Sequence, residues 1–504
     1  MAISTTIPAS WNLPLFWAVV DGTMAGNLSE AQRALLVGQM LTTGANKGTA
    51  LPNVPTPVGS AALAGELFGV GSMLYRMVVA FFACNTTQQL WCLPVADPSA
   101  GVAAHGTITI TAGTASGMLA FYIAGQLVSI AVGSTDTPTI IAGNIATAIN
   151  ANLALPVTAI AAVGVVTLTC QWKGLTGNDI TIIPNYLGAY GGQILPVGMT
   201  FTVAPMSGGA GEPDMVAAIS SIQMLEFDYV GLPYTDTGTM SAWGTEYGFG
   251  TGGRWNFTRQ QYGMVLTASR DSYANLLTWG LAQNSPVIST MAVEVGTPSP
   301  VWEIAAAYAS VAALGFSADP ARPLQTLELL GILPAPLASR FIQGQQNSLI
   351  NSGLAVQAVD PSGNMMILRE QSQYQENSFG QSDTAFGLLT IIATLQELLR
   401  RMKSSITSKY PRVKLIPDGT KIGPGQAAVT PTDVKAELIS EFVQAAYDGL
   451  VSNLPAFIAN LVVEIDDNNP NKLNILWPPQ LAGQLRQFDV LAQFRLLYPP
   501  ISAT

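Results

Sequence analysis

The sequence predicts a multi-domain α/β protein with a layered α/β core, an inserted β-rich domain, a C-terminal α+β domain and extended terminal arms. Its 504 residues exceed what one compact core holds, so roughly two to four domains are expected. Apolar strand patterns alternate with helical patterns up to residue 97 and again after residue 208, which indicates a layered α/β core. Between them lie short, Thr-rich alternating runs, which are typical of β-structure.

These composition changes predict where the domains begin and end. We expect an N-terminal arm at 1–30, an α/β core from 31–97 and 208–345, an inserted outer domain at 98–207, a C-terminal α+β inner domain at 346–485, and a C-terminal arm strand at 486–504. The Gly-rich run at 207–211 reads as a hinge between insert and core. It lacks the Lys-Ser/Thr pair of a phosphate-binding loop.

Apolar spacing places the core elements. We expect strands at 33–40, 90–95, 229–232, 263–269 and 285–294, and helices at 58–69, 72–84, 213–225, 271–283 and 302–314. Inside the insert, one helix at 138–152 interrupts the strands.

The last third of the chain mixes helices with strands. The turn Asp360-Pro-Ser-Gly363 between two apolar runs predicts a β-hairpin at 354–370. We expect helices at 383–409 and 433–452, and strands at 457–466, 472–477 and 486–497.

Charge and hydropathy limit the class of function. Only 10% of residues are charged, against about 25% in an average soluble domain, and 49% are apolar, so much of the surface is expected to meet other protein. No run approaches the roughly 20 apolar residues of a membrane span, and no secretory signal is visible, so we expect synthesis in the cytoplasm without membrane insertion. The net charge of −10 argues against direct nucleic-acid binding.

The candidate catalytic and metal-binding residues do not form a site. Asp21, His105 and Ser116 follow the chain order of a subtilisin-like triad, but His105 and Ser116 fall on one strand and its turn, where a triad cannot form. Asp466 and Asp467 read as a hairpin turn rather than a glycosidase pair. With one His and three Cys in the chain, we expect no metal site, no cofactor and no enzyme activity.

A series of segments, in order along the chain, resembles one family. They are LVGQM at 36–40, VGSAALAGELFGVGSMLYRMVVAFFACN at 58–85, LWCLPVAD at 90–97, FYIAGQLVSIAV at 121–132, GLTGNDI at 174–180, NYLG at 185–188, DPARPLQTLELLGI at 319–332 and KYPRVKLIPDG at 409–419. Together they are similar to the Mu-like bacteriophage contractile tail sheath proteins. That resemblance implies a sheath core of subtilisin-like topology without the protease site.

The resemblance also implies a function and partners. Sheath subunits would polymerise as rings stacked into a helical tube around an inner tail tube, and the tube would contract to drive that inner tube through a target envelope. The expected partners are further copies of the chain, the inner tail tube protein, and baseplate and tail terminator proteins, within a phage virion or a related injection particle. The alternatives are another tail or baseplate component, and a carboxylate-dependent surface glycan hydrolase.

Two terminal segments suit strand exchange between neighbouring subunits, because each is too apolar for a loose tail. The expected strand residues are Leu13, Leu15, Trp17 and Val19 near the start and Phe488, Val490, Ala492, Phe494 and Leu496 near the end. The alternative is that each strand pairs within its own subunit.

A basic cluster suggests a contact with the inner tube. Arg400, Arg401, Lys403 and Lys409 lie close together in an otherwise acidic chain, with Arg412 and Lys414 just beyond. Such cations could hold an acidic tube by screened, reversible contacts. The alternative is a solvated helix end, whose cations suit the helix dipole.

Overall fold

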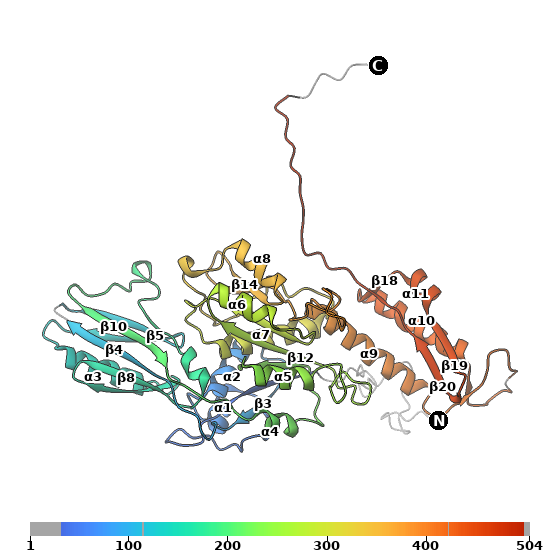
Figure 1. The fold of residues 1–504 in the computed structure, drawn as a ribbon, viewed down its shortest axis with the longest axis horizontal. Helices are drawn as coiled ribbons and strands as arrows, with labels where there is room; N and C mark the ends of the chain where they lie inside the picture. The colour runs from blue at the N-terminus through green and yellow to red at the C-terminus, as the bar shows by residue number, and fades with distance from the viewer. Residues whose placement is uncertain (1–31, 113–114, 422, 498–504) are drawn as a thin grey trace, which may run out of the picture.

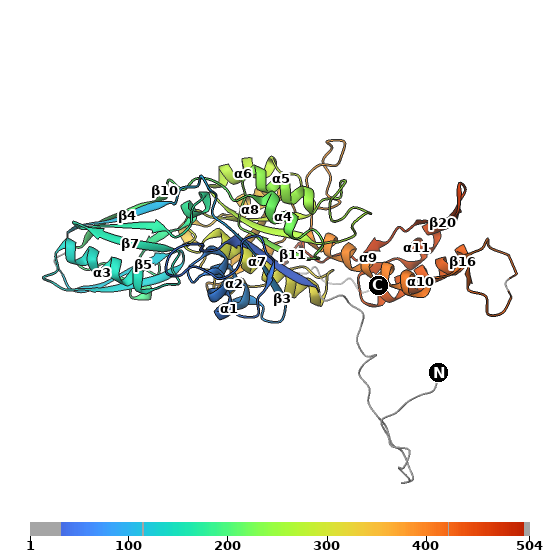
Figure 2. The ribbon, with the colours of Figure 1, turned by 90° about the horizontal axis from the view of Figure 1, so that it is seen from below.

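The computed structural model describes residues 32–112, 115–421 and 423–497. The expected N-terminal arm residues Leu13, Leu15, Trp17 and Val19, and also Asp21, lie outside the described residues. The fold is the multi-domain α/β structure that the sequence predicts. Figure 1 shows an elongated molecule, with an inserted unit at one end, a core unit in the middle and a C-terminal unit at the other end. The same order along the long axis is visible from below in Figure 2.

An eight-stranded sheet, ordered β15-β14-β13-β12-β11-β1-β3-β2, forms the centre of the core unit. Its strands are β1 (Arg33–Gln39), β2 (Thr56–Pro57), β3 (Gln89–Val95), β11 (Tyr229–Leu232), β12 (Met264–Arg270), β13 (Ile288–Val293), β14 (Ala355–Val359) and β15 (Met365–Arg369). All neighbouring pairs are parallel except β2 with β3 and β14 with β15. Because helices cover parallel strands, β1, β11, β12 and β13 are buried along nearly their whole length rather than at alternate residues.

Helices from the chain segments before and after the insert pack on this sheet. They are α1 (Ala61–Phe68), α2 (Met73–Cys84), α4 (Met215–Ser221), α5 (Thr237–Glu246), α6 (Tyr273–Leu281), α7 (Val301–Ala318) and α8 (Gln343–Asn351). The alanine-rich helix α7 packs against β11, β12 and α2. It is long and apolar enough to cross a membrane, but 78% of it is buried inside the fold, as for a core helix.

The inserted unit consists of two small antiparallel sheets and one helix, as the alternating pattern predicts. One sheet has the order β10-β4-β8-β7 and the other β6-β5-β9. The elements are β4 (His105–Ala112), β5 (Gly117–Ile123), β6 (Gln126–Val132), α3 (Pro138–Ala151), β7 (Val157–Ala162), β8 (Val165–Cys170), β9 (Ile182–Pro184) and β10 (Thr200–Ser207). Short 3-10 turns occur at Leu175–Asp179, Ala189–Gly191 and, in the core unit, Leu337–Ser339.

One expected boundary differs from the structure. The hairpin β14–β15 falls within the expected C-terminal segment 346–485, but β14 pairs in parallel with β13, with Met291 opposite Ala355. The hairpin therefore extends the core sheet. Sequence alone could not place it, because a hairpin pattern fixes its own two strands and not the third strand beside them.

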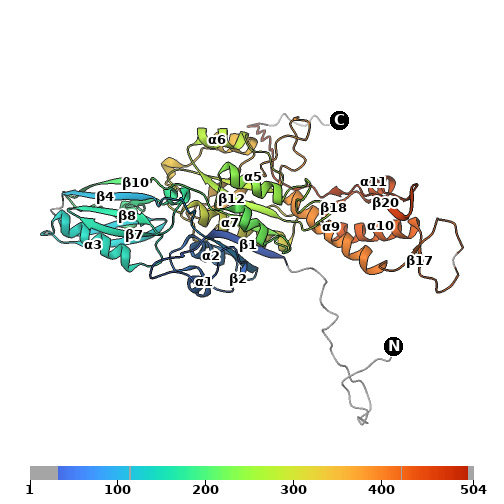
Figure 3. The same cartoon turned by 60° about the horizontal axis from the view of Figure 1, so that its bottom comes forward.

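The C-terminal unit has its own small hydrophobic core, built on α9 (Leu389–Lys409) and α10 (Pro431–Tyr447). Figure 3 shows these helices side by side, which agrees with their contacts. The remaining elements are β16 (Lys414–Leu415), β17 (Ala428–Val429), β18 (Val451–Ser452), α11 (Leu454–Asn460), β19 (Val462–Asp466), β20 (Asn469–Leu476) and β21 (Gln480–Leu481). The strand expected at 457–466 begins only at Val462. Asn453 caps a helix before it, and Pro455 lies in the first turn of that helix, where proline is favoured.

Candidate assembly surfaces

The last described residues leave the body of the protein. After β21 the chain forms no further helix or strand up to residue 497, and it extends away from the molecule in Figure 1. We call residues 487–497 the C-terminal arm. Six of its large apolar side chains are mostly exposed, namely Phe488 at 79%, Val490 at 83%, Leu491 at 83%, Phe494 at 85%, Leu496 at 93% and Leu497 at 84%; Ala492 is exposed as well. The strand expected here finds no partner among the described residues of its own subunit.

A buried ion pair holds the root of this arm. Arg486 donates two parallel hydrogen bonds to the carboxylate of Glu370, one of them 2.9 Å long, and Glu370 is fully buried. Glu370 directly follows β15, and the same guanidinium lies 3.5 Å from the hydroxyl of Thr390 in α9. The arm root is therefore bound to the core sheet and to α9 at one point.

A second buried carboxylate, Asp228, holds the first described strand. Its Oδ2 accepts the backbone N–H of Arg33 at 2.8 Å, and its Oδ1 lies 2.5 Å from Arg400 of α9 and also accepts from Gln396. Burial raises the pKa of Asp228, while Arg400 and the Arg33 N–H oppose that rise by stabilising the charged form. The carboxylate joins β1, β11 and α9.

The predicted basic cluster is largely paired inside the subunit. Besides the Arg400–Asp228 contact, Arg401 bonds to Glu397 at 2.6 Å and to Asp448 at 2.5 Å, and Lys409 pairs with Glu437. Lys403 is exposed and has no ion pair within the described part of the chain. Three of the four expected tube-contact residues are thus paired within the subunit, and Lys403 is the one whose charge is available to a partner.

A groove of about 720 Å³ lies beside these residues, between the C-terminal and core units. Basic side chains of α9 and acidic side chains from both units line it together, including Glu226, Glu441 and Asp448. The mixture of charges makes this groove nearly balanced rather than a basic surface. An acidic partner would therefore meet little net positive charge here.

The hairpin β19–β20 has the longest strands of the C-terminal unit. Each strand pairs with the other, and neither has a second partner among the described strands. Val462 and Leu476 on these strands are 43% and 62% exposed. Both outer edges therefore offer free backbone groups to an added strand.

Polar contacts dock the inserted unit on the core. Arg76 of α2 forms a buried ion pair with Glu303 of α7 and donates to the backbone carbonyls of Ala124 and Ala154 in the insert. Gln39 at the end of β1 donates to Asp97 and to the carbonyl of Lys173. The insert is thus bound at its base and not merely tethered.

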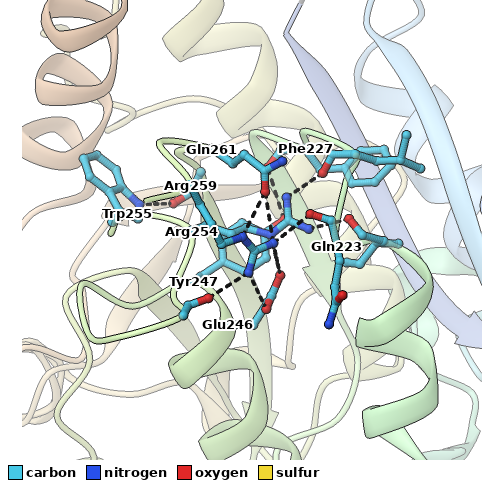
Figure 4. A network of polar contacts seen from close by, with 12 residues as sticks. Gln223, Phe227, Glu246, Tyr247, Arg254, Trp255, Arg259 and Gln261 are labelled. Carbon is cyan, nitrogen blue, oxygen red and sulfur yellow. Dashed lines mark hydrogen bonds and ion pairs between the residues drawn. The ribbon is translucent and has the colours of Figure 1, made fainter. Parts of the chain in front are cut away.

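Figure 4 shows a further polar network, which joins residues of the loop 248–263 to the core unit. Arg254 has no exposed surface, bonds to Glu246 at 2.9 Å and donates to the carbonyls of Leu225 and Ile222 just after α4. Its guanidinium lies 4.8 Å from the centre of the Tyr247 ring. Arg259 also pairs with Glu246 and donates to the carbonyl of Gln223. The two cations fix the loop against the end of a helix.

The residues considered for catalysis do not come together. His105 Nδ1 lies 3.0 Å from the Thr169 hydroxyl, a contact between neighbouring strands. Asp466 accepts from Lys472, Asn474 and turn amides, as expected of a hairpin turn, and these contacts lower its pKa to about 2. No group of three metal-ligating side chains occurs among residues 32–497 that the structure describes. The three cysteines are free thiols.

Comparison with known proteins decides the family. Residues 208–372 match the phage tail sheath protein central domain, and residues 381–495 match the phage tail sheath C-terminal domain. The chain is also 36% identical over 500 residues to the Mu-like prophage FluMu tail sheath protein of Haemophilus influenzae, covering 98% of this chain and 100% of that protein. The chain belongs to the phage tail sheath family.

Solved structures of sheath proteins are also similar to this sheath protein. That of Desulfitobacterium hafniense has 11% identity and a TM-score of 0.49, covering 94% of this chain and 97% of its own. That of Listeria innocua has 10% identity and a TM-score of 0.47, covering 90% and 93%. An anti-feeding prophage baseplate chain has 10% identity and a TM-score of 0.46, covering 96% and 99%.

Family membership confirms the predicted function at the level of the whole protein. This sheath protein is a structural subunit of a contractile tail sheath and a component of the virion. Sequence reasoning proposed the arm and the basic cluster, whose roles stay predictions, but missed Glu370, Asp228 and Arg254. Lone buried charges carry no sequence pattern, and their partners come from distant segments.

Proposed function

We propose that copies of this sheath protein polymerise into a helical tube around an inner tail tube, linked by their terminal arms. Contraction of that tube drives the inner tube through a target envelope, with baseplate and tail terminator proteins at its ends. The subunit is made in the host cytoplasm and acts mechanically, without catalysis, cofactor, direct nucleic-acid contact or membrane insertion. The alternative is a different structural role in the tail or baseplate.

The observation that carries this proposal is the exposed C-terminal arm. Its apolar side chains cost free energy in water, so they favour a partner surface. In an extended strand, Phe488, Val490 and Phe494 face the same side. Eleven residues span about 35 Å, which is enough to reach a neighbouring subunit.

Strand addition explains how the arm binds. We propose that it pairs with an open β-edge of a neighbouring copy, for which the outer edges of β19 and β20 are suited. About six backbone hydrogen bonds, each contributing roughly 0.5–1.5 kcal/mol, would stabilise the contact by several kcal/mol. The conformational entropy lost when the arm becomes ordered reduces that gain. The apolar side chains on the inward face, the side that carries Phe488, Val490 and Phe494, would also be buried against the neighbouring copy. The N-terminal arm residues Leu13, Leu15, Trp17 and Val19 have the same proposed role.

The inner-tube contact is the second part of this proposal. We assign it to the exposed Lys403 together with Arg412 and Lys414, which are exposed as well. Arg400, Arg401 and Lys409 contribute less, because carboxylates of their own subunit already neutralise them.

Two matched variants test the arm. The first replaces Phe488 and Phe494, on the inward face, by Ser; the second replaces Leu491 and Leu497, which are 83% and 84% exposed on the opposite face, by Ser. Electron microscopy of the purified full-length chain should show tubes for the wild type and the second variant, and rings or monomers for the first. Equal tube formation by both variants would end the proposal for the arm.

A further inference from the structure

The arm of this sheath protein does not begin where its secondary structure ends. After β21, the backbone N–H of Ala482 donates to the carbonyl of Leu450 at 2.9 Å, and the side chain of Gln484 donates to the carbonyl of Ala321 at 3.1 Å. Arg486 then binds Glu370. From residue 487 onward every described side chain is exposed. The transition from a partly buried to an exposed chain therefore falls at Arg486.

The contact at Arg486 has the geometry of a strong anchor. Its planar guanidinium forms a two-pronged contact with Glu370, whose carboxylate is fully buried, while Arg486 itself is 14% exposed. Such bidentate pairs fix direction as well as distance. Gln484 Oε1 also accepts from Arg486 Nε at 2.9 Å, so a local hydrogen bond holds the guanidinium in place as well.

The position of Glu370 determines which elements of the subunit would bear tension applied to the arm. Glu370 follows β15 at the edge of the eight-stranded sheet, and its carbonyl accepts the N–H of Leu389 at the start of α9. The nearest β-structure of the C-terminal unit, the pair β18–β21, has only two residues in each strand. Without the anchor, tension would first peel this small pair.

We propose that Glu370 and Arg486 are positioning residues that anchor the C-terminal arm to the core sheet. They set the point and direction in which the arm leaves its subunit, and they transmit load from the arm to β15 and α9. The inference rests on the proposed role of the arm in joining subunits. It holds whichever edge of the neighbour receives the arm.

The test compares three full-length variants with a truncation after residue 486. Arg486→Gln leaves the buried carboxylate of Glu370 without its cation, which by itself destabilises the fold. The double variant Glu370→Gln/Arg486→Gln removes both charges and therefore separates loss of the anchor from misfolding. Lys47→Gln, which removes one cation from an exposed loop of the core unit, is the matched control. Amide hydrogen exchange of the unassembled subunit and the urea concentration that dissolves preformed tubes are measured for each.

The double variant should show exchange at residues 480–486 at least about tenfold faster, with β15 unchanged, because the anchor holds the root selectively. Its tubes should dissolve at a lower urea concentration than those of the wild type, while its thermal midpoint stays close to that of Lys47→Gln. A purely structural role would instead shift the midpoint and the exchange of β15.

The truncation separates the two claims. If it abolishes tubes while the double variant exchanges and dissolves like the wild type, the anchor is overturned and the role of the arm stands. If the truncated chain still forms tubes of wild-type resistance, the role of the arm is overturned, and with it the reason for an anchor.

Discussion

Asp228 and Arg400 lie 172 residues apart in the sequence, yet their carboxylate and guanidinium meet at 2.5 Å. This ion pair joins the core sheet to α9, the first helix of the C-terminal unit. Asp228 also accepts the N–H of Arg33, so the start of β1 is held at the same point. A residue predicted as part of a partner-binding surface is thus a connection inside the subunit.

Arg400 and Lys403 should therefore respond differently to neutralisation. Arg400→Gln leaves the nearly buried Asp228 without its cation and should lower the free energy of unfolding by about 2–4 kcal/mol. Lys403→Gln, three residues along the same helix, should change it by less than about 0.5 kcal/mol, because Lys403 is exposed. Urea unfolding followed by far-UV circular dichroism measures both. Equal stabilities would contradict the assignment.

The buried Arg254 should be essential for the loop 248–263. Arg254→Met removes its bonds to Glu246 and to two backbone carbonyls, leaving those groups buried without this donor. We expect a loss of about 3–5 kcal/mol, with faster amide exchange in this loop than elsewhere. Arg412→Met is the exposed control. An unchanged exchange pattern would show that Arg259 alone holds the loop.

Arg76 and Glu303 should be strongly coupled. Arg76→Leu leaves a buried carboxylate whose pKa burial already raises, and should cost about 3–5 kcal/mol near pH 7. Adding Glu303→Gln removes that charge and should recover at least about 1 kcal/mol. A double-mutant cycle by thermal unfolding measures the coupling. Strictly additive losses would mean that the two side chains do not interact.

Stability should depend on pH through Glu212 at the base of the insert. Burial, with help from the nearby Asp236, raises the pKa of Glu212 from 4.5 to about 7. The folded protein then binds more protons than the unfolded chain between these values, so this contribution to stability is lost as pH rises from about 4.5 to 7.

Glu212→Gln should remove that dependence. Because Glu212 is partly exposed, solvent reduces the effect, and we expect the variant to be about 1 kcal/mol more stable than the wild type at pH 8. The exposed Glu464→Gln is the control. Thermal unfolding curves at pH 5 and pH 8 measure how the stability of the wild type and of each variant changes with pH. A wild-type pH slope in Glu212→Gln would contradict the assignment.

The sequence predicted most of the elements but few of their long-range contacts. Strands such as β11, Tyr229–Leu232, were placed to the residue, because continuous apolar runs between turn residues are a local signal. The helix α11 was missed, since its few apolar residues fit a strand as well. The basic cluster was visible, and Arg401 pairs with Glu397 four residues before it, but the carboxylate partners 172, 47 and 28 residues away could not be inferred.

The C-terminal arm was predicted for a physical reason that needs no partner structure. A terminal segment with alternating apolar residues has too little charge to remain a solvated tail. Its apolar side chains are exposed in the structure, and its pairing with a neighbouring copy stays a prediction. What the sequence could not supply was the anchor at Arg486, because one arginine beside polar residues carries no signal of a buried carboxylate 116 residues earlier.

The most direct test is the structure of the assembled protein by cryo-electron microscopy. We predict a helical tube in which residues 488–496 form a β-strand hydrogen-bonded to the sheet of a neighbouring copy, while Arg486 stays on Glu370 of its own subunit. A tube in which this segment folds back on its own subunit, or a purified chain that remains a monomer, would contradict the account.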